Sequence, residues 1–194
     1  MDSGVREVNM KCWCLMGCLC LLACGGSADP ASVAPSHCTA ASGSQWLTGQ
    51  VSAVLDGDTV VLGSGSSAEH VRLQGIDAPE LAQNEGPAAR QALSLRALHQ
   101  NTRVAYTQRD RYGRILGQVF STNCKDLNLY MLQQGQAWFY TTYACDLEPQ
   151  RRALYASAQT LARSQGLGLW QQSQPTPPWV YRNGDDPATP VCAD

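Results

Sequence analysis

Two short segments, Leu55-Asp56-Gly57-Asp58-Thr59 and Val71-Arg72-Leu73-Gln74-Gly75-Ile76-Asp77-Ala78-Pro79-Glu80, contain four carboxylates and one arginine. Each acidic pair follows an apolar run and flanks a residue that bends the backbone, Gly57 in the first segment and Pro79 in the second. Carboxylates on two neighbouring loops can bind one hard cation, which takes several oxygen ligands in irregular geometry. The alternative is a pair of polar surface turns, and the residues around the two segments decide between these interpretations.

The apolar runs beside these segments predict a meander of three strands. The strands are expected at Trp46–Leu55, Thr59–Leu62 and His70–Leu73, with Gly63–Ser67 as a hairpin loop. Because side chains alternate across a strand, Arg72 faces away from its two apolar neighbours and lies beside the loops if those neighbours point into a core.

The rest of the chain predicts two more strands and three helices. A helix is expected from Glu85-Gly86-Pro87 to about Gln100, since proline suits a first helical turn. Strands are expected at Arg103–Gln108 and Ile115–Ser121, joined by the tight basic turn Arg109–Arg114. Asp126 can cap a short helix that ends at Gly135, and a third helix is expected over Glu148–Ser164.

Helical spacing predicts which sides of the longer helices are buried. The first helix has apolar residues at four-residue spacing, widened by two leucines: Ala89, Leu93 and Ala97, with Leu95 and Leu98. The third carries a stripe of Leu154, Ala158 and Leu161. The order of elements is compatible with a mainly β fold with flanking helices, in the α+β class: a five-stranded OB-fold barrel plus three helices.

The chain of 194 residues is long enough for one domain with extensions, and its net charge of −2 gives no bulk basic field. Any contact with nucleic acid must therefore depend on local arginines. We expect residues 1–24 to be a signal peptide, 25–45 a flexible linker, 46–170 the folded domain, and 171–194 a proline-rich tail.

The first 24 residues resemble an export signal. The apolar run from Cys12 to Ala23 follows Lys11 and is too short to span a bilayer. Leu21-Leu22-Ala23-Cys24 resembles a bacterial lipobox, which implies lipidation of Cys24 and a membrane-anchored lipoprotein facing the periplasm or the cell exterior. Ordinary cleavage and an uncleaved anchor are the alternatives.

Four cysteines remain after this leader, at positions 38, 124, 145 and 192. An even number in an exported protein favours disulfides, and four cysteines allow three pairings. Pairing Cys124 with Cys145, and Cys38 with Cys192, would tie segments that we expect to be near each other. The cysteines and the scattered histidines show no zinc-ligand spacing.

Three motifs occur in order: Asp56-Gly57-Asp58-Thr59, then Arg72-Leu73 with Gly75-Ile76-Asp77-Ala78-Pro79-Glu80, then Asp110-Arg111-Tyr112-Gly113-Arg114. Together they resemble the thermonuclease family of staphylococcal-nuclease-like phosphodiesterases, over about residues 46–170. The resemblance implies a five-stranded OB barrel with three helices.

The resemblance also implies a role for each residue that matches a motif. Asp58 and Asp77 match calcium-binding carboxylates, and Ala78 matches a residue whose backbone carbonyl completes the protein ligands. The matches to catalytic residues are Glu80, which activates or orients the attacking water, and Arg72 and Arg114, which hold the scissile phosphate. Residues in supporting or stacking positions are Asp56 and Thr59 around the metal, and Tyr112 and Tyr143 near the substrate.

The expected function is therefore a calcium-dependent endonuclease that cleaves DNA and RNA with little sequence preference, leaves 3′-phosphates, and acts as a monomer. The alternative is a non-catalytic OB-fold module that binds nucleic acid or a protein partner. Arg72 and Arg114 could also be structural, one neutralising buried acids and the other lying on a hairpin surface. The low lysine content, two in the chain, implies weak general attraction to polyanions.

Overall fold

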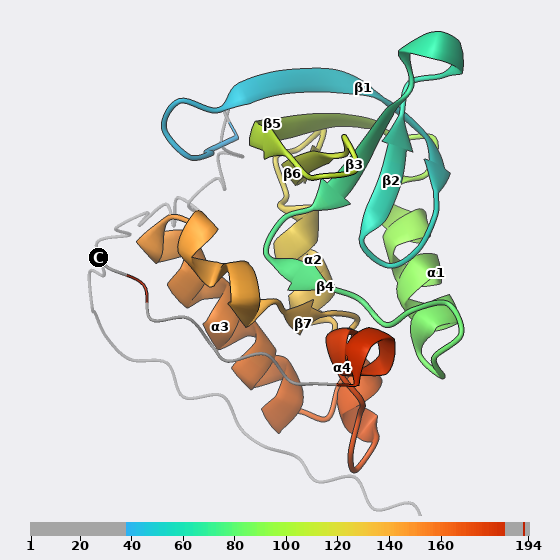
Figure 1. The fold of residues 1–194 in the computed structure, drawn as a ribbon, viewed down its shortest axis with the longest axis vertical. Coiled ribbons are helices and arrows are strands. Elements are labelled where there is room, and N and C mark those ends of the chain that lie inside the picture. Colours follow the sequence, from blue (N-terminus) through green and yellow to red (C-terminus); the bar gives the residue numbers. More distant parts are fainter. Residues whose placement is uncertain (1–37, 185–191, 193–194) are drawn as a thin grey trace, which may run out of the picture. The chain divides into compact units, whose positions relative to one another are not determined.

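The structure, a computed structural model, describes residues 38–184 and 192 (Figure 1). In this part of the chain a closed barrel is formed by the strands β1 (Gln45–Val54), β2 (Thr59–Leu62), β3 (Glu69–Leu73), β5 (Asn101–Arg109) and β6 (Ile115–Ser121). A separate two-stranded sheet pairs β4 (Ile76–Asp77) with β7 (Trp138–Phe139). The α-helices are α1 (Gly86–Ala97), α2 (Leu127–Gln133), α3 (Pro149–Ser164) and α4 (Pro178–Asn183), and the 3₁₀ turns are η1 (Gly65–Ser67), η2 (Thr141–Asp146) and η3 (Gly168–Gln171).

The barrel order is β1-β2-β3-β6-β5, and this closure confirms the predicted OB-fold, α+β class. Its neighbouring strands run antiparallel, apart from β3 and β6, which pair in parallel. Figure 1 shows β4 and β7 between the barrel and the helices α3 and α4. The short sheet therefore joins the end of the meander to the helical part.

The first helix is shorter than predicted, and its buried side is narrower. Ala89, Leu93 and Ala97 are fully buried, as their spacing predicts, but Leu95 is 76% exposed. The helix ends at Ala97 rather than about Gln100, because Leu98 leaves helical geometry and His99 has a φ of 60°.

The third helix has the predicted length but turns a different stripe inward. Leu154 and Leu161 are exposed, and the buried residues are Tyr155, Ala158 and Ala162. Ala158 is buried as predicted, whereas the prediction was wrong for the two leucines, since the residue after each of them is buried instead. Spacing identified the period of the helix, whereas its buried side is set mainly by packing against α2, with further contacts to β7, η2 and η3.

A buried amide fixes the loop that connects the barrel to β4. Asn128 of α2 is fully buried; its side chain accepts from the backbone N–H of Val119 at 3.0 Å and donates to the carbonyls of Gln74 and Gly117 at 2.9 and 3.0 Å. Asp126 caps α2 as predicted, since its carboxylate accepts from the N–H of Leu129. These bonds hold the chain between Leu73 and Ile76, next to the acidic segment.

The segment after the expected folded domain contains a helix to which sequence analysis assigned no structure. Pro178 begins the short helix α4, whose Trp179 is 6% exposed and stacks on Tyr140 with ring centroids 5.4 Å apart. Trp179 also meets Trp138 edge to face. Aromatic packing therefore holds α4 against β7 and the residue that follows it.

None of the helices in the described residues is long and apolar enough to cross a membrane. The predicted signal segment, including Cys24, lies outside these residues.

The described residues contain two disulfides, but their pairing differs from the one expected. Cys38 bonds Cys124, and Cys145 bonds Cys192. Cys38 packs with Ala105 of β5 and Phe120 of β6, which places it beside the turn that carries Cys124. The expected pairing of Cys124 with Cys145 was wrong because proximity in sequence was a poor guide to proximity across the barrel.

We predict that peptide mapping without reduction will recover the pairs Cys38–Cys124 and Cys145–Cys192. These bonds close segments with separations of 86 and 47 residues, so each should stabilise the fold by about 2–5 kcal/mol. Denaturant unfolding of the double variants Cys38→Ser/Cys124→Ser and Cys145→Ser/Cys192→Ser would measure the two contributions separately. Recovery of a Cys124–Cys145 peptide would contradict the structure.

Candidate active site

Arg72 lies between two buried carboxylates at the end of β3. Its Nη1 is 3.1 Å from Asp58 Oδ2, and its Nη2 is 2.7 Å from Asp77 Oδ1. Asp58 and Asp77 are 5% and 1% exposed. Arg72 therefore bridges acids from both acidic segments, and we call these residues, with Glu80 and Arg182, the carboxylate–arginine cluster.

The barrel fixes the orientation of Arg72 as strand alternation predicts. Val71 and Leu73 are fully buried on the inner side, which leaves Arg72 on the outer side. Its Nη1 also donates to the carbonyls of Leu73 and Ile76, at 3.1 and 2.9 Å. Backbone acceptors and carboxylates together hold the guanidinium in one position.

The turn between β1 and β2 presents Asp58 through local hydrogen bonds. Asp56 Oδ1 accepts from the N–H of Asp58 at 2.9 Å, and the Thr59 hydroxyl donates to Asp58 Oδ1 at 3.1 Å. The N–H of Ala78 donates to Asp58 Oδ2 at 2.6 Å. The predicted supporting residues Asp56 and Thr59 thus contact Asp58, and a bond from Ala78 joins the two acidic segments.

Gly57 allows this close approach. A Cβ atom at position 57 would lie 2.6 Å from Ala78 Cβ and 2.7 Å from Ala89 Cβ. Any side chain would therefore push the Asp58 turn away from the segment that carries Asp77.

Burial dominates the electrostatics of the two aspartates. Removal from water raises the pKa of Asp58 well above its ordinary value, and the opposing effect of Arg72 does not cancel it. Burial likewise raises the pKa of Asp77, although Arg72 and Arg182 oppose it. A further positive charge beside either carboxylate would therefore stabilise its ionised form.

Glu80 lies at the more exposed border of the cluster. Its N–H donates to Gln83 Oε1 at 2.8 Å, and its side chain is 37% exposed. Its Oε1 is 2.6 Å from Nη1 of Arg182. Glu80 is thus the carboxylate of the cluster most open to solvent.

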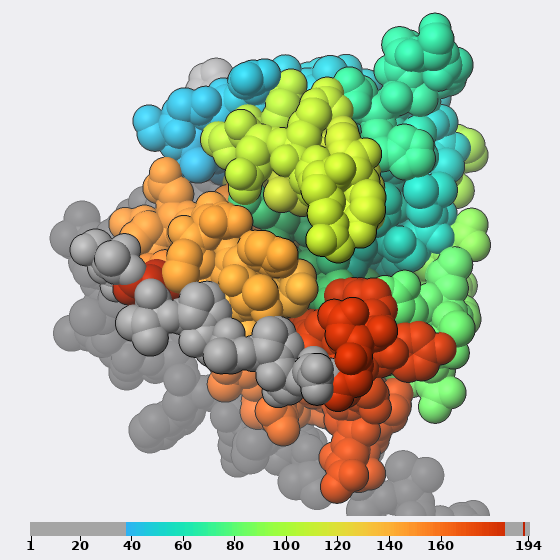
Figure 2. All heavy atoms as spheres, viewed as in Figure 1, coloured from blue at the N-terminus to red at the C-terminus, as the bar shows by residue number. Residues whose placement is uncertain are grey.

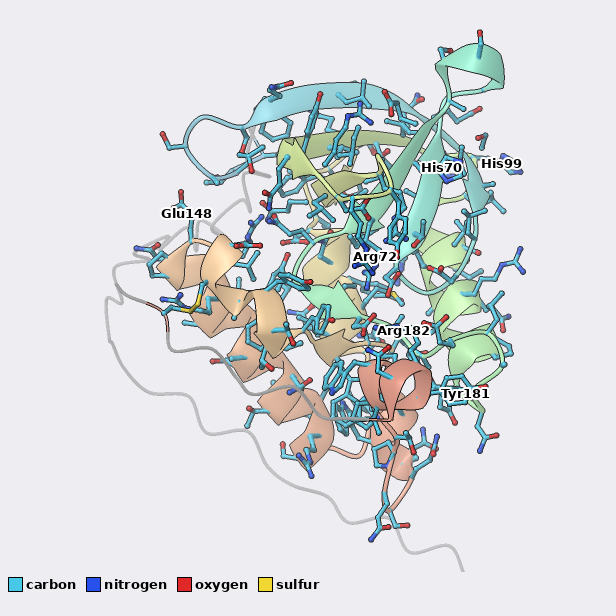
Figure 3. The ribbon with its side chains drawn as sticks, in the orientation of Figure 1. His70, Arg72, His99, Glu148, Tyr181 and Arg182 are labelled. Carbon is cyan, nitrogen blue, oxygen red and sulfur yellow. A yellow bond between two sulfur atoms is a disulfide. The ribbon has the colours of Figure 1, made fainter. Side chains whose placement is uncertain are left out.

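Arg182 is a member of the cluster that sequence analysis missed. Its Nη2 is 2.7 Å from Asp77 Oδ2, so α4 brings a second guanidinium to this buried acid. Figure 3 shows Arg72 and Arg182 reaching the same region from β3 and from α4. Sequence separations of 105 and 102 residues from Asp77 and Glu80 gave no local signal for this contact.

Arg114 directly precedes β6, the strand that pairs with β3, but its own ion pair is with a different acid from those of Arg72. In the parallel β3–β6 ladder Ile115 pairs with Val71 and Leu116 pairs with Arg72, so Arg114 lies two residues before the partner of Arg72. Its Nε donates to Asp110 Oδ2 at 2.7 Å. Burial alone would raise the pKa of Asp110, but hydrogen bonds from Arg114 and Tyr112 outweigh it and lower that pKa.

Asp110 therefore positions Arg114, although sequence analysis assigned it no role. The signal was present in the sequence, because an aspartate three residues before a turn glycine commonly accepts from the turn's N–H groups. Asp110 Oδ1 accepts from the N–H groups of Tyr112 and Arg114.

The two predicted substrate tyrosines are exposed. Tyr112 is 68% exposed and lies beneath the guanidiniums of Arg111 and Arg114. Tyr143 is 56% exposed and meets Tyr140, which stacks on Trp179 of α4. In Figure 2 the basic turn 109–114 (yellow-green) and α4 (red) lie on the same face of the molecule. Both tyrosines have ring surface free for stacking.

Within the described residues, no three side chains among histidine, cysteine, aspartate and glutamate are grouped as a metal site. The predicted ligand set is smaller, since it comprises the carboxylates of Asp58 and Asp77 and the carbonyl of Ala78. All three are hard oxygen donors, the kind that calcium takes. The donor chemistry of these two buried carboxylates and the carbonyl therefore fits a divalent cation.

Comparison with known proteins gives consistent matches. A family model described as Staphylococcal nuclease homologue matches residues 70–172. An uncharacterized endonuclease of Escherichia coli is 38% identical over 137 residues, covering 71% of this chain and 86% of that protein. A micrococcal nuclease of Shigella flexneri is 36% identical over 149 residues, covering 73% of this chain and 83% of that protein. Asp58 and Arg182 both lie outside the residues that the family model matches.

Proposed function

The chain belongs to the family of staphylococcal nuclease homologues and is a nuclease, and on this premise we propose that it is a calcium-dependent endonuclease for DNA and RNA. The observation that carries the proposal is the bridge made by Arg72 between Asp58 and Asp77, with Glu80 beside it. In this proposal Asp58, Asp77 and the carbonyl of Ala78 hold Ca²⁺.

The charge of the substrate explains why the site needs this composition. A phosphodiester is an anion, and attack by water increases the charge on its phosphoryl oxygens. Bound calcium would supply positive charge to those oxygens, which lowers the barrier most in the transition state. Arg72 and Arg114 donate to the same oxygens through planar guanidiniums that stay charged at all working pH values.

Glu80 is the base in this proposal. Its carboxylate accepts a proton from water as the water oxygen forms a bond to phosphorus, which typically contributes about 10²–10⁴-fold to the rate. The bond from phosphorus to the 5′ oxygen breaks, and that oxygen takes a proton from solvent. The products are a 3′-phosphate and a 5′-hydroxyl.

Exposed aromatic rings support a broad substrate range. Tyr112 and Tyr143 can stack on any base, because every base has a π-face, and such contacts do not read sequence. The arginines around Tyr112 supply local positive charge to a protein whose net charge is −2. We therefore propose cleavage with little sequence preference by a monomer.

Export and lipid anchoring at Cys24 are also part of the proposal. The two disulfides support export, since such bonds persist in oxidising compartments. Lipid labelling of the expressing cells should mark the wild-type protein and not Cys24→Ser. Equal labelling of both proteins would exclude a lipid on Cys24.

Glu80→Gln and Arg114→Ala should each lower kcat by about two orders of magnitude or more, because they remove a base and a phosphate donor. Digestion of plasmid and single-stranded DNA and of RNA would measure this, with circular dichroism to verify folding. Arg96→Gln is a suitable control, because Arg96 lies at the end of α1 over Tyr130. Near-wild-type rates in both site variants would refute the assignment.

Chelation of calcium should abolish cleavage, and added calcium should restore it. Asp77→Asn should lose both activity and calcium binding, since the amide keeps the shape of the side chain but lacks its charge. Rates in chelator equal to those in calcium would contradict the proposed metal.

A further inference from the structure

The segment 171–184 binds to the loop that carries Glu80 at three places. Gln83 Nε2 donates to the carbonyl of Thr176 at 3.0 Å, and Gln172 Nε2 donates to Glu85 Oε1 at 3.1 Å. The third contact is the ion pair between Arg182 and Glu80. The C-terminal segment is thus built onto one border of the candidate active site.

With Arg182, both carboxylate oxygens of Asp77 accept a hydrogen bond from a guanidinium. Oδ1 of this carboxylate accepts from Arg72 at 2.7 Å, and Oδ2 accepts from Nη2 of Arg182 at 2.7 Å. Asp77 is 1% exposed, so little solvent reaches either oxygen. A cation that approaches Asp77 therefore meets two guanidiniums already paired with this enclosed carboxylate, and their positive charge opposes its binding unless one of them moves away.

The two arginines differ in how firmly they are held. Arg72 is 13% exposed at its side chain, lies on a barrel strand and donates to two backbone carbonyls as well as to the acids. Arg182 is 36% exposed and comes from a helix of six residues, and its hydrogen bonds in the cluster are to Asp77 and Glu80 alone. The Arg182 guanidinium can therefore leave Asp77 at a lower cost in free energy than the Arg72 guanidinium.

We propose that Arg182 is a built-in competitor for the metal ion: its guanidinium binds Asp77 and Glu80 in the metal-free protein and must release Asp77 when calcium binds. This inference depends on the proposed function, because it takes Asp77 as a calcium ligand. Trp179 holds α4 against Tyr140 and Trp138, so the guanidinium is presented at high local concentration. The C-terminal segment therefore sets the calcium affinity of the site.

The competition has a thermodynamic consequence that can be measured. Calcium binding in the wild-type protein includes the cost of breaking the Arg182–Asp77 ion pair, and a variant without this guanidinium does not bear that cost. A coupling of ordinary size corresponds to a change in affinity of about five- to a hundredfold. Arg182→Gln should therefore bind calcium more tightly than the wild-type protein.

Isothermal titration with calcium chloride, in the absence of nucleic acid, tests this. The proteins are wild type, Arg182→Gln, Arg182→Lys and the charge-matched control Arg96→Gln. We expect the lowest Kd in Arg182→Gln and an unchanged Kd in Arg96→Gln. The Kd of Arg182→Lys should lie between those of Arg182→Gln and the wild-type protein, because lysine keeps the charge but lacks the planar fork that pairs with two acids.

Thermal unfolding provides a second readout that does not depend on catalysis. A tighter site gains more stability from the same calcium concentration, so the calcium-induced rise in Tm should be larger in Arg182→Gln than in wild type. Equal Kd values and equal Tm shifts in these two proteins would overturn the proposed competition.

Calcium binding by Asp77→Asn distinguishes failure of the proposed competition from failure of the proposed function. If wild type and Arg182→Gln bind calcium equally, and Asp77→Asn does not bind it, the metal site stands and the competition is refuted. If Asp77→Asn binds calcium as wild type does, Asp77 is no ligand and both proposals fail.

Discussion

The arrangement of the site depends on one constraint: Asp58 and Asp77 are buried carboxylates that share Arg72. Removing a carboxylate from water costs several kcal/mol, and a partner cation and hydrogen bonds must offset that cost. The N–H of Ala78 and the hydroxyl of Thr59 provide such bonds to Asp58, and Arg72 provides the charge. Loss of Arg72 would remove the ion pair of Asp58 and one of the two ion pairs of Asp77, so its structural and chemical roles cannot be separated by deleting it.

The barrel topology explains how residues distant in sequence reach the same region. β3 and β6 are parallel neighbours, which requires the chain between them to cross from one end of the barrel to the other through α1 and β5. This crossover places Arg114 beside the strand that carries Arg72.

Local patterns predicted much of this fold because they report local physics. The strands followed from apolar runs, and the outward direction of Arg72 followed from alternation against Val71 and Leu73. The exposed Leu95, Leu154 and Leu161 show the limit of this approach, since an apolar residue on a helix need not face the core. Which side of α3 packs inward depends on Tyr155, and that depends on neighbours that the helix sequence does not specify.

The disulfide pairing and Arg182 could not be derived from local sequence for a related reason. Both join segments that are adjacent only after the barrel has closed and α4 has packed on Tyr140 and Trp138. For Arg182, an isolated arginine in a proline-rich segment resembles many solvated surface residues. Only the three-dimensional structure shows that its nearest acids are those of the candidate active site.

The guanidinium of Arg182, the second one beside Asp77, changes how folding of the protein depends on metal binding. Without Arg182, Glu80 would lose its arginine partner and Asp77 would keep Arg72 alone, so the site would depend more on calcium to offset carboxylate repulsion, and its stability would follow the calcium concentration more closely. With Arg182 in place, these acids are paired before any metal arrives. The proposed exchange of Arg182 for calcium replaces one cation with another, so the barrel and its disulfides can remain folded in surroundings that are poor in calcium while the proposed activity follows the metal.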